Sequence, residues 1–221
     1  MISENRDLKE ILNLCVKAED KIWAGLSLDS DFMSKHMEQK DRDKVIEGSI
    51  GCGTDWAVRI REKYPVQTAV NIIKHMGILY HLESYDKPGK NQMIFFAQYK
   101  DGQIYISRER TEEIREMVKQ YQLKEILGEF EPEEVLAAHE LFHYMESQNP
   151  DILTRNFKIK GCGLFRKEGC PYMASEIGAF AFARELCGIS FHPRILEIIA
   201  LYKPLPDTAY KIAKDIYQYN L

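Results

Sequence analysis

The chain has 221 residues, of which 45% are hydrophobic, and a formal net charge of −4 from 30 basic and 34 acidic residues. A chain of this length and hydrophobic content can bury one substantial core, and no Pro-rich or Gly/Ser-rich stretch marks a linker. Neither sign of charge gathers into a tail or a stripe, so the composition argues against a nucleic-acid-binding protein.

The first residues, MISENRDLKE, are polar and mixed in charge, which is not typical of a signal peptide, and no apolar run is long enough to cross a membrane. The five cysteines form no CxxC pair, and their odd number does not fit a secreted disulfide framework. Cys162 and Cys170 lie among glycines, but without a second pair of ligands we interpret them as ordinary thiols rather than as a zinc or redox site. We therefore expect a cytoplasmic protein that does not bind membranes.

The first part of the chain is predicted to be helical. Apolar residues recur at helical spacing over residues 7–26, and a second helix is expected over residues 55–64. The polar segment between them contains the run GSIGCG, which indicates a loop or turn. We expect residues 1–58 to form a helical extension that packs on a core domain of residues 59–221.

The hydrophobic period then changes from helical to alternating. A helix over residues 65–77 begins with a proline and ends with a glycine, both at favoured positions. Alternating apolar residues at 78–82 predict a short strand, and DKPGKN at 86–91 indicates a turn. The runs MIFFAQYK and QIYISRE flank Asp101-Gly102, a dipeptide typical of a type I′ hairpin turn. We expect one small, mainly antiparallel β-sheet, whose aromatic strands are core or hold an extended peptide at an exposed edge.

The second half of the chain is predicted to be helix-rich, with an irregular segment from 148 to 173 that contains prolines and glycines. Pro132, followed by two glutamates, is a favoured helix start. Helices are expected over 111–128, from 132 onward, over 175–186, and after Pro193 and Asp207. The elements together predict an α+β fold.

The run AAHELFHYME, residues 137–146, contains an HExxH motif within the predicted helix. His139 and His143 lie four residues apart on one helix face, so both imidazole rings can bind one zinc ion. Glu140 lies on the flank of that face, where a carboxylate can reach water beside the metal and act as a general base. The motif predicts a hydrolytic zinc site.

A catalytic zinc site needs a third protein ligand. The metzincin extension is absent, because the third residue after His143 is Glu146 and the sixth is Asn149. Glu176 is the best candidate, since it begins an otherwise apolar helix, where a buried carboxylate needs a partner. Weaker alternatives are Glu146, interpreted as a solvated helix residue, Asp151 and Glu185.

The run EIGAFAFAREL, residues 176–186, resembles the E-x-x-A-x-x-F-A-x-x-L helix of the ImmA/IrrE-like metallopeptidases, which also follows an HExxH helix in that family. The resemblance covers roughly residues 60–190. It implies a zincin-like fold and one zinc ion held by His139, His143 and Glu176, with Glu140 as the base. It also implies a peptide or protein substrate, such as a repressor-like regulator.

The motif does not identify the donor that stabilises the developing oxyanion. His192, Tyr172 and Arg184 are candidates, because each lies in or beside the predicted third-ligand helix. We expect a zinc-dependent metallopeptidase. The alternative is a non-catalytic zinc-binding regulatory or interaction protein of the same fold, and the presence of Glu140 argues against it, because structural zinc needs no base.

Overall fold

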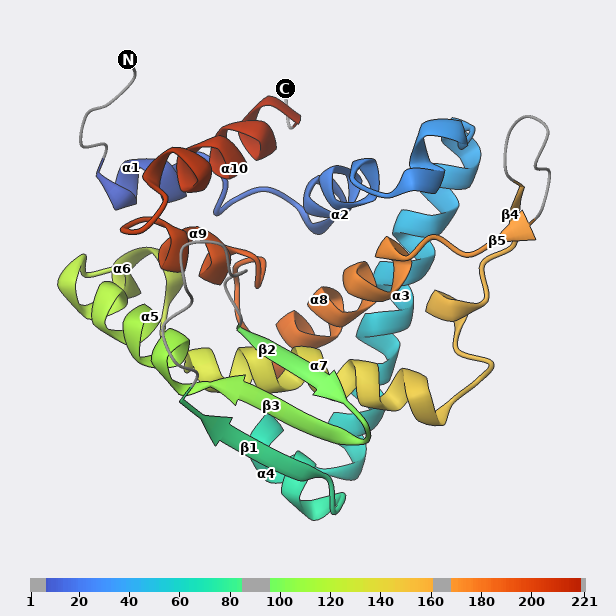
Figure 1. Cartoon of the computed structure of the whole chain (residues 1–221), viewed down its shortest axis with the longest axis horizontal. Coiled ribbons are helices and arrows are strands. Elements are labelled where there is room, and N and C mark those ends of the chain that lie inside the picture. The colour runs from blue at the N-terminus through green and yellow to red at the C-terminus, as the bar shows by residue number, and fades with distance from the viewer. Residues whose placement is uncertain (1–6, 85–95, 161–167, 220–221) are drawn as a thin grey trace.

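The fold is built from helices packed around a small mixed β-sheet (Figure 1). The computed structural model describes residues 7–84, 96–160 and 168–219. The helices are α1 (Leu8–Asn13), α2 (Asp20–Asp29), α3 (Gln39–Lys63), α4 (Ala69–His75), α5 (Arg108–Gln120), α6 (Lys124–Leu127), α7 (Pro132–Gln148), α8 (Met173–Cys187), α9 (Ile195–Leu201) and α10 (Pro206–Tyr219), with short 3-10 turns η1 (Phe32–His36) and η2 (Leu153–Arg155). The strands are β1 (Leu79–Glu83), β2 (Ala97–Lys100), β3 (Gln103–Ser107), β4 (Ile159–Lys160) and β5 (Glu168–Gly169). The predicted α+β class is confirmed.

The main sheet has the strand order β1-β3-β2. Strands β2 and β3 form the predicted hairpin, and the turn residues Asp101 and Gly102 have φ values of 50° and 79°, as a type I′ turn requires. The prediction of a mainly antiparallel sheet is wrong, because β1 pairs with β3 in parallel. Strand β3 lies between the other two strands, parallel to β1 and antiparallel to β2. Strands β4 and β5 form a separate antiparallel pair, and the predicted turn at 86–91 lies outside the described residues.

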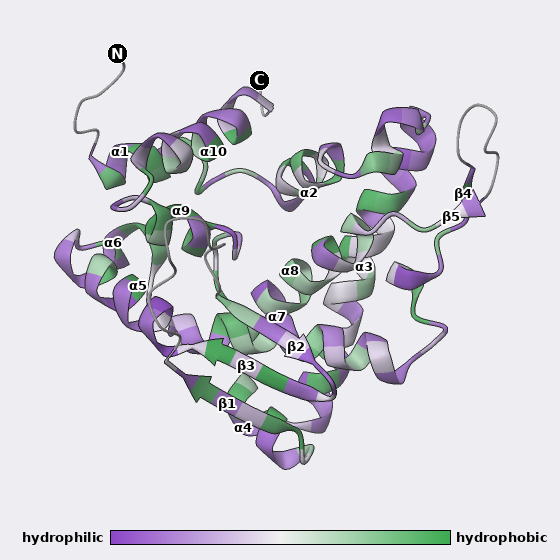
Figure 2. Ribbon diagram, viewed as in Figure 1, coloured by the Kyte–Doolittle hydropathy of each residue, from purple (hydrophilic) through white to green (hydrophobic). Residues whose placement is uncertain are grey.

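Helix α7 lies between the sheet and α8, and α8 packs along α3. Ile104 and Ile106 of β3 are buried against α7 and its neighbours, while Gln103 and Tyr105 between them are only partly buried. Figure 2 shows hydrophobic residues alternating with more polar ones along β3. The sheet therefore covers one side of the HExxH helix and α8 covers the other.

A second core joins the two ends of the chain. Leu8 and Trp23, from α1 and α2, share it with Ile198 of α9 and Ile216 of α10. The predicted boundary after residue 58 falls inside α3, so that helix belongs to both predicted parts. Among the described residues, none of the helices is long and apolar enough to span a membrane.

The loop predicted at the run GSIGCG is wrong, because these residues lie within the 25-residue helix α3. Gly53 of this run serves close helix packing rather than a turn. A Cβ atom on Gly53 would overlap the backbone oxygen of Gly178 in α8 and would lie 2.9 Å from the backbone nitrogen of Phe182. Only a glycine permits α3 and α8 to approach this closely.

Two other predicted helices are divided. Residues predicted as one helix from 7 to 26 form α1 and α2, because α1 packs against α10 and the chain turns before α2 joins α3. The charged helix starts at Arg108, capped by Ser107 rather than Thr111. It ends before Gln122, whose φ of 51° is left-handed, and α6 follows.

The close approach of α3 and α8 predicts opposite effects for two glycines of one helix. We expect Gly53→Ala to reduce the free energy of unfolding by about 1–3 kcal/mol, because the added methyl group clashes with the backbone of α8. A Cβ atom on Gly51 would meet nothing within 4 Å, so Gly51→Ala should raise the free energy of unfolding by up to about 1 kcal/mol through helix propensity. Urea denaturation measures both, and equal effects would contradict the packing described.

Candidate metal centre

Helix α7 presents His139 and His143 toward α8. Pro132 occupies the first turn of α7, and two glutamates follow it near the positive end of the helix dipole. The Nε2 atoms of His139 and His143 lie 3.2 Å apart. The four-residue spacing in the sequence therefore brings two imidazole nitrogens to one point.

Glu176 approaches this point from the first turn of α8. Its Oε2 lies 3.3 Å from Nε2 of His139, and its Oε1 lies 3.4 Å from Nε2 of His143. One ligand atom from each of the three residues lies within 4.8 Å of the other two. The three residues form a triad that can hold a metal ion, and they are the set that the sequence predicted.

The ionisation of Glu176 suits a ligand. Burial alone would raise the pKa of this carboxyl group, but the hydrogen bond and charge of His139, followed by the charge of His143, lower its pKa to about 2. The carboxylate form, which binds metal ions, is therefore the stable one.

Glu140 lies beside the triad in a different environment. The residue is 6% exposed, and burial raises the pKa of its carboxyl group. Its Oε2 accepts a hydrogen bond of 2.6 Å from the backbone N–H of Tyr99 in β2, an edge strand of the sheet. The edge strand thus fixes the position of the carboxylate, and burial favours its ability to take a proton.

A cavity of about 600 Å³ reaches the triad. One part of its wall is polar and includes Arg155, Tyr172 and Ser175 in addition to the triad and Glu140. The other part is apolar and is made by Phe96, Val135, Leu136, Phe180, Pro193 and Leu196. The cavity can therefore hold a molecule that has both polar and apolar groups.

Of the three predicted oxyanion donors, only Tyr172 lines this cavity. Its side chain is exposed, and its hydroxyl donates to Oε1 of Glu176 over 3.5 Å. His192 is buried with its ring stacked on Trp23 at 4.7 Å, and its Nδ1 accepts from the backbone N–H of Arg194. Arg184 pairs with Asp20 and donates to the backbone oxygen of Ser190. His192 and Arg184 therefore have structural contacts instead.

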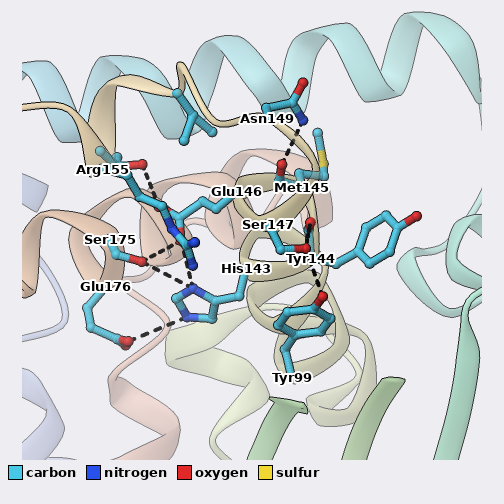
Figure 3. A network of polar contacts seen from close by, with 12 residues as sticks. Tyr99, His143, Tyr144, Met145, Glu146, Ser147, Asn149, Arg155, Ser175 and Glu176 are labelled. Carbon is cyan, nitrogen blue, oxygen red and sulfur yellow. Dashed lines mark hydrogen bonds and ion pairs between the residues drawn. The ribbon is translucent and has the colours of Figure 1, made fainter. Parts of the chain in front are cut away.

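The sequence interpretation of Glu146 as a solvated residue is wrong. Its side chain is fully buried and lies 3.1 Å from Nδ1 of His143 (Figure 3). The three-residue spacing from His143 on one helix was the available signal for this contact. Asp151 and Glu185 are exposed and lie outside the triad. Cys170 donates its thiol proton to the backbone oxygen of Thr154, and Cys162 lies outside the described residues.

A triad of ligand atoms, a buried carboxylate beside it and a cavity that reaches both are the parts that a hydrolytic metal centre needs. Comparisons with protein-family models, curated proteins and solved structures give no match to this chain.

The burial of His192 predicts a dependence of stability on pH. Burial, together with the charges of Arg194 and Arg184, lowers the pKa of His192 well below its ordinary value. The unfolded chain takes up a proton below about pH 6.5 and the folded chain does not, so the free energy of unfolding falls as the pH drops. This residue contributes a slope of up to about 1.4 kcal/mol per pH unit.

His192→Phe keeps a ring against Trp23 and removes the titrating group. We expect the free energy of unfolding of this variant to fall less steeply than that of the wild type between about pH 6.5 and 5. Denaturant titrations at several pH values measure both slopes. Identical slopes would contradict a neutral, buried His192.

Proposed function

We propose that the chain is a zinc-dependent metallopeptidase that hydrolyses a peptide bond in a protein substrate. The observation that carries this proposal is the convergence of His139, His143 and Glu176 beside the buried carboxylate of Glu140. Three protein ligands with one adjacent carboxylate outside the ligand set are the composition of a hydrolytic zinc site. The resemblance of residues 176–186 to the ImmA/IrrE-like metallopeptidases supports the same function.

The donor set fits zinc. Two imidazole nitrogens and one carboxylate oxygen are donors that zinc accepts in catalytic sites, whereas Ca²⁺ and Mg²⁺ prefer oxygen ligands alone. When bound, zinc supplies Lewis acidity, which makes water more acidic and a carbonyl carbon more electrophilic. His139, His143 and Glu176 would hold the ion.

Glu140 is the residue that moves protons in this proposal. Its carboxylate takes a proton from a water molecule in the cavity as the water oxygen bonds to the peptide carbonyl carbon. The same group then gives the proton to the amine as the C–N bond breaks. The hydrogen bond from Tyr99 occupies Oε2 and keeps the carboxylate directed at the cavity. Its raised pKa brings it closer to the value at which one group can both accept and donate a proton near neutral pH.

Tyr172 is the residue proposed to stabilise the oxyanion. It lines the cavity, and of the three candidate donors it is the one whose side chain reaches Glu176. A phenolic O–H close to the developing negative charge lowers the energy of the transition state. The apolar wall near Phe180 and Leu136 would exclude water and hold an apolar side chain of the peptide.

The alternative is a non-catalytic zinc-binding regulatory protein of the same fold. Burying a carboxylate costs free energy, and a structural zinc site has no use for Glu140. The buried position of this residue at the cavity therefore favours the peptidase.

We expect Glu140→Gln to reduce peptide hydrolysis by a factor of about 10² to 10⁴, because the amide cannot accept the proton. The zinc content should stay that of the wild type, since Glu140 is not one of the three ligands. Cleavage of a proteome-derived peptide library, read by mass spectrometry, measures the hydrolysis. The matched control is Glu185→Gln, an exposed position on α8, which should retain both properties. Full hydrolysis by the zinc-loaded Glu140→Gln variant would contradict the role of Glu140.

A further inference from the structure

Glu146 has an environment that ordinary helix residues lack. Its side chain is fully buried near the C-terminal end of α7. Ser175 of α8 donates to its Oε2 over 2.5 Å, and Thr154 of η2 donates to its Oε1 over 2.5 Å. Nε of Arg155 lies 3.6 Å from the same Oε2. Side chains from α8 and η2 therefore supply donors to one buried carboxylate of α7 (Figure 3).

These contacts determine which nitrogen of His143 carries a proton. Nδ1 of His143 lies 3.1 Å from Oε2 of Glu146 and 3.2 Å from Oγ of Ser175. The single hydroxyl proton of Ser175 goes to Glu146, so its oxygen can only accept from His143. Both neighbours of Nδ1 are acceptors, and both lie closer to it than the carboxylate of Glu176 lies to Nε2, at 3.4 Å, so the contacts favour Nδ1 as the protonated nitrogen.

The consequence for the metal centre lies on the other side of the ring. In a neutral imidazole with a proton on Nδ1, the lone pair is on Nε2. Nε2 of His143 is the atom that faces His139 and Glu176. The hydrogen bonds at Nδ1 of His143 thus leave the lone pair of Nε2 free to bind a metal ion.

The two histidines are held differently. Nδ1 of His139 is buried without a hydrogen-bond partner among the described residues, and its ring packs against Phe180 at 4.5 Å. Of the two rings, His143 is therefore the one whose Nδ1 is held by polar contacts. A carboxylate behind a metal-binding histidine fixes the tautomer of the ring and raises its basicity.

We propose that Glu146, supported by Ser175 and Thr154, is a positioning residue that holds His143 as the Nδ1–H tautomer and so sets the affinity of the triad for zinc. The proposal rests on the proposed function for the identity of the metal. The tautomer itself does not depend on any metal.

The first experiment uses the full wild-type chain after treatment with a chelator. Long-range proton–nitrogen NMR correlations of its histidine rings, assigned with His143→Gln, are recorded above the pH at which the His143 ring loses its charge. We expect the Nδ1–H form of His143 in the wild type. In Glu146→Leu, which removes the acceptor at similar volume, the Nε2–H form should become populated. A wild-type His143 in the Nε2–H form would overturn the proposal.

The second experiment measures zinc affinity by competition with a chromogenic chelator. We expect zinc binding to weaken by about 10- to 100-fold in Glu146→Leu and by less in Glu146→Gln, whose amide oxygen can still accept from Nδ1–H. Glu185→Gln on α8 is the control and should bind zinc as the wild type does. Thermal unfolding of the metal-free proteins shows that each variant is folded.

The outcomes separate this proposal from the proposed function. If the role of Glu146 is purely structural, Glu146→Leu lowers the unfolding temperature and leaves the tautomer and the zinc affinity unchanged. This result would overturn the positioning role. A wild type that holds the Nδ1–H tautomer, loses it in Glu146→Leu and takes up no zinc would support the positioning of His143 and contradict the zinc peptidase. Weaker zinc binding with the expected tautomer change supports the positioning role and the zinc site on which the peptidase depends.

Discussion

The close packing of α8 between α3 and α7 is the constraint on which the triad of His139, His143 and Glu176 depends. Gly53 of α3 lets its backbone meet the backbone of α8 at Gly178. A Cβ atom on Gly178 would in turn lie 2.9 Å from the ring of Phe142 in α7. Gly178 lies two residues after Glu176, so the same contacts that press the three helices together also place the Glu176 carboxylate opposite the two histidines of the triad. Bulkier residues at these glycines would move the ligand with its helix.

Carboxylates buried near the centre are kept there by donors from different parts of the chain. Glu140 accepts a hydrogen bond from a backbone N–H of β2, and Glu146 accepts hydrogen bonds from hydroxyl groups of η2 and α8. Glu176 faces the two imidazole rings. A buried carboxylate without such partners is strongly unfavourable. The sheet, the 3-10 turn and α8 therefore contribute to the site as sources of polar contacts as well as packing surface.

Local patterns in the sequence predicted the parts of the fold that depend on local chemistry. The dipeptide Asp101-Gly102 forms the hairpin turn, and Pro132 starts α7. The set of candidate ligands could also be predicted from the sequence, because HExxH fixes two residues on one helix face and Glu176 stands at the start of an apolar helix.

Features that depend on distant neighbours could not be predicted in this way. The run GSIGCG has the composition of a turn, and only the close approach of α8 explains why a glycine is needed at Gly53 inside a helix. Glu146 has the charge of a surface residue, and its burial depends on contacts with α8 and η2, from residues that follow it by 29 and 8 positions. The parallel pairing of β1 with β3 likewise joins strands that are separated in the sequence by β2.

Anomalous X-ray scattering above and below the zinc absorption edge tests the presence of the metal centre most directly. The crystals would contain protein purified without chelators and without added metal. We expect one anomalous peak per chain at about 2.0–2.2 Å from Nε2 of His139, Nε2 of His143 and an oxygen of Glu176. Crystals of zinc-supplemented protein with no anomalous peak at this triad would contradict it.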